Sequence, residues 1–493
     1  MRKLLLATAA IVGASVGTMG LAMAQAPETL QGTVATPANG GSYTYGDNNY
    51  MGGTMTKGPV ANPTPGTMVI RLGVRMDVAV GASWSNLDSY SAGTPGTAAY
   101  TARKLSPVQI MEYMRIYPGV DAMAANGLRY GAAIELRQNF ATAPQAEPLT
   151  NGGTVYTSSQ TVYVRRAFGY IAADNFGIVR LGEMDGMIGT YDEGGATTGV
   201  FLSPTGTIVG GNLQGNNVGN AWMIPYFAAQ SGNEYGNAKI VYLSPSFYGF
   251  DFGVQYAPSP FNGYAIGGFQ TVVGGGASCA SADAAGCPNV SSSTDALSGS
   301  VVHNQYAVGA RYQGKLGPAA VLAYAVYMGS GHTNYTGGPI PTDVTATSTL
   351  SGKFDDLSLG MFGANVTMDG FSVFGNIMTG AYNGILGAKP AGAPDATGFG
   401  VGAKYAFGPY TIGAVYSQFD SQGAWNLTGV SQRHEWVFAA AATYSPAPGL
   451  TFALDYNYGQ RHQGDFNFMT GGVGSAYNNV QAQGVMLDTV VKW

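Results

Sequence analysis

The sequence predicts an all-β protein, a 16-stranded antiparallel transmembrane β-barrel whose third long loop folds inward. Three observations lead to this fold. Apolar residues alternate with polar, charged or small ones over many strand-length segments. Only 10% of the residues are charged and 75 of 493 are glycine, whereas soluble domains are roughly 25% charged. Short and long connections between the segments alternate, as in outer-membrane barrels.

The first 24 residues have the features of a secretory signal peptide. Arg2 and Lys3 precede an apolar run, and Ala22 to Ala24 form an A-x-A cleavage site. A membrane anchor helix is the alternative, which the glycines of the run and its A-x-A ending disfavour. Because cleavage removes two of the 22 basic residues and no acid, the formal charge changes from −5 to 20 − 27 = −7.

Residues 25–66 are rich in Gly, Asn, Thr and Pro and contain few apolar residues. This composition predicts a flexible N-terminal segment without a fold of its own, although such a segment could also plug a lumen. The barrel is predicted to occupy residues 67–493.

The first predicted strand, 67–84, shows the alternation most clearly. Ile70 and Leu72 fall on one face, while Arg75 and Asp77 fall on the other. The segment is longer than the usual strand of about five or six residues and suits a tilted crossing of a bilayer. Charged residues share the second face with Gly and Ala, which a water-filled lumen permits and a packed core does not.

Sixteen segments of this kind follow one another, an even number as expected for a bacterial barrel. They span residues 67–84, 108–117, 127–140, 160–172, 177–183, 236–245, 249–257, 303–313, 318–328, 354–367, 370–382, 396–407, 409–420, 433–445, 449–459 and 481–493. The long links are predicted to lie outside the cell, and the third of them is 184–235.

The third link is predicted to form a functional constriction. A loop of this length is usually either functional or disordered, and the charged residues near it favour a functional loop. Four carboxylates stand at or just before its start: Glu183, Asp185, Asp192 and Glu193. Inward arginines on the strands would form an opposing basic wall: Arg71, Arg75, Arg115, Arg129, Arg137, Arg165 and Arg180. Facing rows of opposite charge would leave a transverse field across a narrow aqueous gap.

Simpler roles exist for each of these residues. An inward arginine can pair with a lumen carboxylate away from the constriction, and the loop carboxylates can be exposed at the loop base. The adjacent Arg165 and Arg166 cannot both face inward on a regular strand, so either one faces out or a bulge intervenes. We expect Arg165 to face inward.

Three runs of the sequence resemble the general porins of Gram-negative bacteria, in particular those of alphaproteobacteria. They are YMRIYPGVDAMAANGLRYGAAIELRQNF (113–140), VYVRRAFGYIAADNFGIVRLGEMDG (162–186) and VYLSPSFYGFDFGVQYAPS (241–259). The C-terminal QGVMLDTVVKW, which ends on Trp493, resembles the terminal strand of bacterial outer-membrane proteins. The resemblance implies a homotrimer in the bacterial outer membrane, with the third long loop forming the pore eyelet.

Other chemistry has little support. Cys279 and Cys287 lie in one long link of an exported chain, so a loop disulfide is expected rather than a zinc site. The four histidines are dispersed, and no glycine-rich run carries the Lys-Ser/Thr of a phosphate loop. We therefore expect no enzyme activity, no cofactor, no metal and no nucleic-acid partner, although loop Asp and Asn side chains leave calcium open.

Three functions remain open from the sequence. The first is a general diffusion porin that passes small hydrophilic solutes and ions through a charged eyelet. The second is a channel specific for a sugar or an anion, and the third is an outer-membrane enzyme or surface-binding barrel.

Overall fold

The structure is a computed structural model that describes a subset of the chain. The described residues are 63–86, 89–92, 101–104, 108–138, 145–148, 154–157, 162–191, 237–258, 300–301, 304–331, 334–335, 355–382, 389, 391–423, 431–467 and 472–492. The predicted signal peptide, most of the predicted N-terminal segment and Trp493 lie outside these ranges, as do Cys279 and Cys287. Within them, no helix is both long and apolar enough to span a membrane.

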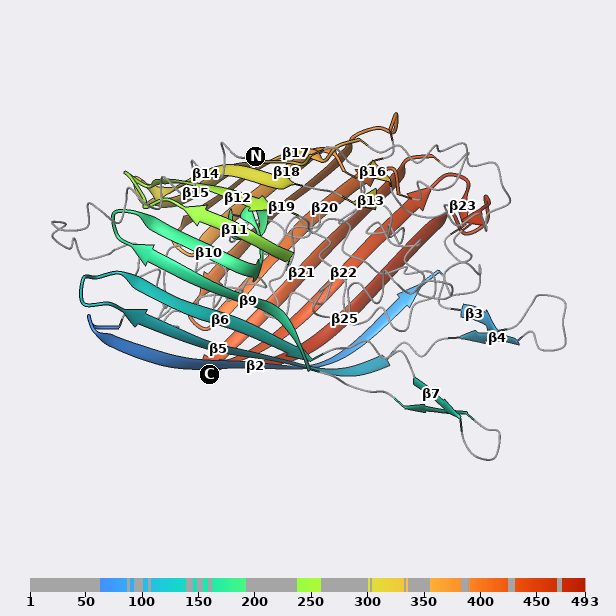
Figure 1. Ribbon diagram of the computed structural model, residues 1–493. Helices are drawn as coiled ribbons and strands as arrows, with labels where there is room; N and C mark the ends of the chain where they lie inside the picture. The colour runs from blue at the N-terminus through green and yellow to red at the C-terminus, as the bar shows by residue number, and fades with distance from the viewer. Residues whose placement is uncertain are drawn as a thin grey trace.

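Sixteen antiparallel strands close into one barrel (Figure 1). They are β2 (Thr67–Ser85), β5 (Val108–Met123), β6 (Arg129–Gln138), β9 (Val162–Ala173), β10 (Gly177–Met184), β11 (Asn237–Leu243), β12 (Phe250–Ala257), β14 (Gln305–Leu316), β15 (Ala319–Gly329), β17 (Ser358–Met368), β18 (Phe371–Ala381), β19 (Ala396–Phe407), β20 (Tyr410–Ser421), β21 (Arg433–Ala447), β22 (Leu450–Gln463) and β25 (Asn479–Lys492). Each overlaps one of the sixteen predicted segments, so the predicted fold class is confirmed.

Closure is achieved by the last strand pairing with the first, since β25 is antiparallel to β2 with Val80 opposite Leu487. A closed barrel leaves no edge strand, so every backbone group in the wall has a neighbour to bond within a bilayer. The described parts of the long links contain four small two-stranded sheets. They are β3 (Ser89–Ala92) with β4 (Thr101–Lys104), β7 (Gln145–Pro148) with β8 (Thr154–Thr157), β13 (Ser300–Val301) with β16 (Asn334–Tyr335), and β23 (Phe466–Asn467) with β24 (Gly472–Val473).

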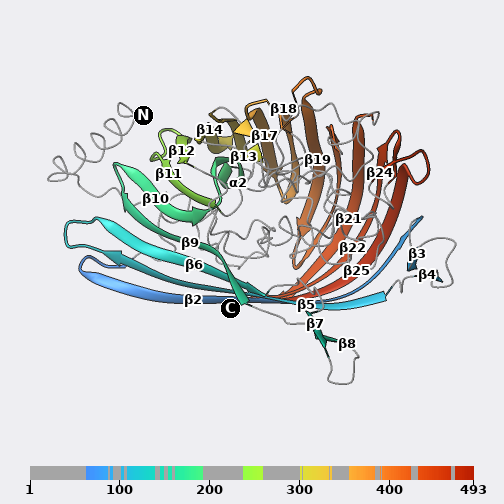
Figure 2. The same ribbon diagram turned by 45° about the vertical axis from the view of Figure 1, so that its right-hand side comes forward.

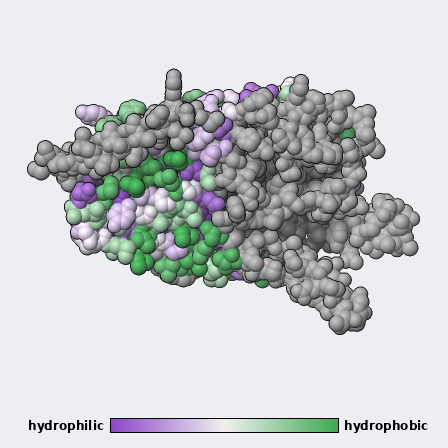
Figure 3. Space-filling view, viewed as in Figure 1, coloured by the Kyte–Doolittle hydropathy of each residue, from purple (hydrophilic) through white to green (hydrophobic). Residues whose placement is uncertain are grey.

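The alternation read from the sequence sets the two faces of the wall. In β2, Ile70 is 74% exposed and Leu72 is 65% exposed, whereas Arg75 and Asp77 are buried on the inner face. Figure 3 shows apolar side chains gathered on the outer face of the strands turned toward the viewer. The outer face is therefore suited to lipid and the inner face carries the charges.

One strand is longer than predicted. β5 continues through Pro118 to Met123, although the sequence pattern predicted a turn from 118 onward. Pro118 stands opposite Leu72 of β2, while the pairing of β5 with β6 is interrupted between Ile116 and Gly119. A proline has no backbone N–H to donate. Pro118 is tolerated here because the ladder between β5 and β6 is interrupted at this position and needs no donor from it.

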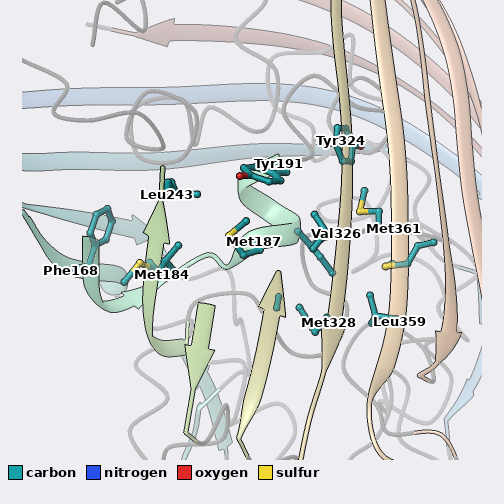
Figure 4. Packing of buried hydrophobic residues seen from close by; sticks show 14 of the residues in the cluster. Phe168, Met184, Met187, Tyr191, Leu243, Tyr324, Val326, Met328, Leu359 and Met361 are labelled. Atoms are coloured by element: carbon teal, nitrogen blue, oxygen red, sulfur yellow. The ribbon is translucent and has the colours of Figure 1, made fainter. Parts of the chain in front are cut away.

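The inner face differs from the predicted polar lumen along β14 to β18. Tyr324, Val326 and Met328 of β15 point inward and are buried, as do Leu359 and Met361 of β17. The short helix α2 (Met187–Tyr191) covers part of this apolar surface from inside the ring of strands (Figure 2). One side of the interior is thus a packed apolar core, shown in Figure 4.

Candidate functional site

Arginines on four neighbouring strands form a basic cluster on the inner wall, which we define as Arg75, Arg115, Arg137, Arg165 and Arg166. Strand register places the first three in one row, because Arg75 stands opposite Arg115 and Arg115 stands opposite Arg137. Like charges directly opposite each other on neighbouring strands repel. The row therefore depends on nearby carboxylates.

Two carboxylates on the same strands offset the repulsion between these arginines. Asp77 accepts a hydrogen bond from Nε of Arg75 at 3.0 Å. Glu135, whose side chain is fully buried, accepts one from Nε of Arg137 and lies within interaction range of Arg115. Each acid sits two residues from its arginine on the same strand, so the period of two places both members of each pair inside the barrel.

A β-bulge turns the two consecutive arginines of β9 to the same side. In the pairing of β6 with β9, Glu135 stands opposite Arg166 and Leu136 opposite Val164, so Arg165 is the extra residue. Such an insertion shifts the alternation by one residue. Arg165 faces inward as expected, and Arg166 does too, which was the bulge alternative left open by the sequence.

Asp185 joins the loop root to this cluster. Its Oδ1 accepts a hydrogen bond from Nη2 of Arg165 at 2.7 Å, and its Oδ2 lies 3.0 Å from Nη1 of Arg166. Glu135 binds the same two arginines, through Nη1 of Arg165 at 3.0 Å and Nε of Arg166 at 2.8 Å. Asp185 therefore clamps the start of the third long loop to the wall.

Two further wall residues hold the loop backbone. Nζ of Lys239 in β11 donates to the carbonyl oxygen of Met184 at 2.6 Å. The backbone N–H of Met187, at the start of α2, donates to Oε1 of Gln255 in β12 at 2.6 Å. Both wall side chains are buried, so these bonds replace contacts with water that the loop backbone would otherwise make.

Helix α2 fits against the wall at two glycines. A Cβ at Gly253 would lie 2.5 Å from Cε of Met187, and one at Gly309 would lie 2.9 Å from the ring of Tyr191. Cζ of Arg311 lies 4.9 Å from the centre of the Tyr191 ring, a cation–π contact. Burial, followed by the nearby charge of Asp251, raises the pKa of the Tyr191 hydroxyl, which therefore stays neutral.

Arg180 belongs to the loop side of the site. Its Nη2 donates to Oγ1 of Thr190 in α2 at 3.2 Å, and its guanidinium lies 5.8 Å from the centre of the Phe168 ring. The contacts described above fix α2 inside the barrel at its start, along its length and at its end. The described part of the third long loop therefore lies inward, as the sequence predicted.

Other predicted site residues lie elsewhere. Arg129 is inward but stands at the short-turn end of β6, where its Nη1 lies 2.9 Å from Oδ1 of Asp174. Glu183 is instead paired with Ala238 on the outward face of β10, because the strand still alternates there and Arg180 faces in. The side chain of Arg71 lies outside the described residues, as do Asp192 and Glu193.

Sequence reasoning missed three residues that build the site, Lys239, Gln255 and Arg311, and it left Arg166 open between an outward position and a bulge. The alternation of its strand could have placed Gln255 on the inner face, opposite Phe252, Val254 and Tyr256. The others carried no motif, since their roles depend on which loop atoms the fold brings to them. Among the residues that the structure describes, no group of three or more His, Cys, Asp or Glu is arranged to hold a metal.

Several solved structures are similar to the chain in fold. A mutant of the Rh. blastica porin is 13% identical, with 86% of this chain and 100% of that chain covered and a TM-score of 0.43. The outer membrane channel DcaP of Acinetobacter baumannii is 9% identical, with 88% and 99% covered and a TM-score of 0.49. An anion-selective porin from Comamonas acidovorans is 12% identical, with 87% and 100% covered and a TM-score of 0.45.

No curated protein matches the chain. The family described as Gram-negative porin matches residues 7–464, which is most of the sequence. This match agrees with the closed sixteen-stranded wall, its apolar outer face and its charged interior. The chain therefore belongs to the Gram-negative porin family and is an outer-membrane diffusion channel.

Proposed function

We propose that this porin is a general diffusion channel whose basic cluster favours small hydrophilic anions over cations of the same size. The observation that carries the proposal is the charge balance of the cluster. Its five arginines are accompanied by three carboxylates, Asp77, Glu135 and Asp185, so the described side chains sum to 5 − 3 = +2. Members of the family are channels and not enzymes, which agrees with the absence of a catalytic motif.

The excess charge acts on solutes because the low-dielectric wall focuses its field into the lumen. At a separation of about 6 Å and an effective dielectric constant of about 20, a unit charge contributes about 3 kcal/mol. Arginine keeps its charge even beside other arginines, so the field does not relax by deprotonation. An anion near the cluster is thus stabilised, while a cation is opposed.

We further propose that Asp192 and Glu193 oppose the cluster and complete an eyelet, as the sequence suggests. Support comes from α2, which carries the chain inside the barrel as far as Tyr191, next to Asp192 in sequence. With these two acids and with Arg180 and Lys239, the inward cations beside the loop root, the sum is 7 − 5 = +2, so such an eyelet would keep both the transverse field and the anion preference. Reversal potentials therefore test both parts of the proposal.

The test is single-channel recording in planar bilayers under a salt gradient. Arg115→Gln removes a charge from the middle of the arginine row, and we expect it to shift the reversal potential toward less anion preference. Arg129→Gln removes an inward arginine at the short-turn end, so it is the matched control and should shift the potential less. Equal shifts, or a cation-preferring parent channel, would contradict the proposal.

We infer that the chain is exported by the predicted signal peptide and assembles as a homotrimer, as its resemblance to alphaproteobacterial porins implies. The apolar outer face leaves room for both lipid and neighbouring subunits. Mass measurement of the detergent-extracted protein, with its detergent subtracted, distinguishes a trimer from a monomer. Mass spectrometry of the mature chain tests cleavage after Ala24, and a chain that keeps residues 1–24 would contradict it.

A further inference from the structure

An aromatic turn extends the lipid-facing surface at one place on the short-turn rim. The turn joins β11 to β12 and consists of Phe247, Tyr248, Gly249 and Phe250. Phe247 and Phe250 exchange both backbone hydrogen bonds, at 2.7 and 2.9 Å, which leaves Tyr248 and Gly249 as the two central residues. Tyr248 is 100% exposed, so its ring makes no packing contact within the described chain.

The backbone at this turn disfavours a tyrosine. Tyr248 has a φ of 51° and Gly249 has a φ of 87°, so both central residues are left-handed. Two-residue turns of this kind favour Asn, Asp or Gly, because a bulky side chain is strained in that conformation. Of the five non-glycine residues with positive φ in the described part of the chain, Asn304, Asp369 and Asp465 follow this preference. Tyr477, near the other rim, is the second exception.

The same rim provides a direct comparison. The turn between β17 and β18 has central residues Asp369 and Gly370, with φ values of 50° and 81°. The two turns thus share one backbone geometry, but only one carries an aromatic ring. The other described two-residue turns of this rim are built from glycine and proline: Gly317–Pro318, Gly408–Pro409 and Pro448–Gly449.

The tyrosine continues a surface that already faces lipid. Phe250 is 59% exposed on the outward face, its ring 4.8 Å from that of Tyr312, and Phe247 beside it is 60% exposed. Phe252 and Tyr242 continue the aromatic surface up the wall, with ring centres 6.0 Å apart. An aromatic ring with a hydroxyl at its tip suits the boundary between acyl chains and headgroups.

The wall is low in this sector. β10 and β12, whose two ends both lie within the described residues, have eight residues each, against 19 in β2. At about 3.3 Å per residue and a tilt of about 40–45°, eight residues cross roughly 19 Å. The apolar band of an outer-membrane barrel is about 25 Å tall, so this sector is short of lipid-facing surface. Flanking residues that reach the interface offset such a mismatch.

We propose that the turn Phe247–Tyr248 is a lipid anchor that inserts into the phospholipid interface on the periplasmic side of the outer membrane. The anchor compensates for the short strands of this sector and holds the rim at the headgroup level. The strained tyrosine is retained because its ring contacts lipid and not the protein.

The test places a fluorescent reporter at the turn. Tyr248→Trp is compared with Asp369→Trp, which puts the same reporter on the same backbone geometry at the same rim. Each variant is reconstituted into phosphatidylcholine vesicles carrying bromine on the acyl chain near the headgroup, and the emission of the parent is subtracted. Unchanged single-channel conductance of both variants shows that the barrel has folded.

We expect the emission of the Tyr248→Trp reporter to be blue-shifted and to lose intensity in brominated vesicles, with little quenching by aqueous iodide. The Asp369→Trp reporter should show the weaker loss and the stronger iodide quenching. Equal behaviour of the two reporters, or a water-exposed reporter at 248, would overturn the proposal. A water-exposed reporter at 248 would show that lipid alone does not hold the turn, and it would favour a partner in the periplasm instead.

Discussion

Arg165 and Arg166 follow each other in the chain, yet both bind Glu135 and both bind Asp185. Only the bulge in β9 permits this, because regular alternation would turn one of them to lipid. An arginine in the lipid-facing position at the bilayer midplane costs about 2–4 kcal/mol. The bulge therefore avoids that cost and doubles the positive charge beside the loop root.

Replacing Glu135 should destabilise the barrel strongly. Glu135→Gln leaves Arg137, Arg165 and Arg166 with one carboxylate fewer, and breaking a buried ion pair costs about 3–5 kcal/mol. Urea unfolding of the protein from lipid vesicles measures the loss. The control is Asp369→Asn, a carboxylate exposed in the turn between β17 and β18, which we expect to change the free energy of unfolding by about 0.5 kcal/mol or less.

Replacing Asp185 should affect the loop rather than the wall. Asp185→Asn weakens the clamp to Arg165 and Arg166, so we expect noisier single-channel current together with a stronger anion preference. Asp77→Asn also removes one carboxylate from beside the cluster, but Asp77 pairs with Arg75 of its own strand and, among the described residues, not with the loop. It should strengthen the anion preference without adding noise. Noise in both variants would show that Asp185 has no special role in holding the loop.

The strand pattern could be predicted from sequence because it is local. Alternation with a period of two fixed the number of strands, the face of residues such as Arg75 and Ile70, and the position of the third long loop. Pro118 misled the prediction, because a proline ends most strands but is tolerated where a ladder is already interrupted.

The site could be predicted only in part, because its contacts depend on how the loop meets the wall. The adjacent arginines raised a bulge at Arg165 as one alternative, but the alternation of a single strand does not decide whether the bulge forms. Lys239 and Gln255 bond to backbone atoms of the loop, and such bonds cannot be predicted from the pattern of side chains in the sequence. One signal was available: the run AAVLAYAVYMG of β15 is apolar on both faces, as expected for a strand that is covered on both sides.

The packing of α2 against the barrel wall should be sensitive to the addition of one methyl group at Gly309. Gly309→Ala would place a Cβ 2.9 Å from the Tyr191 ring and 3.0 Å from Cγ2 of Val326. A ring cannot fold away as a flexible side chain can, so we expect a loss of about 1–3 kcal/mol in urea unfolding. Gly360→Ala is the control, because the nearest atom to its Cβ is 3.9 Å away. A similar loss in both variants would attribute the effect to the wall and not to α2.

A lysine at the long-loop rim should make stability depend on alkaline pH. Nζ of Lys389 lies 2.6 Å from Oδ2 of Asp355 and 3.1 Å from Oδ1 of Asp395, and it donates to the carbonyl oxygen of Ala393 at 2.7 Å. Partial burial lowers the pKa of Lys389, but the hydrogen bonds and charges of the two aspartates outweigh it and raise the pKa above 10.5. The charged lysine is thus bound more strongly in the folded state.

The sign of the effect follows from this shift. Since the folded-state pKa is the higher one, the stabilisation by Lys389 is fully present below pH 10.5 and is lost as pH rises through the folded-state pKa. The difference in unfolding free energy between the parent and Lys389→Met should therefore be constant near neutral pH and should shrink above pH 10.5. If the Lys389→Met difference stays constant into the alkaline range, Lys389 stabilises the fold through packing and not through its charge.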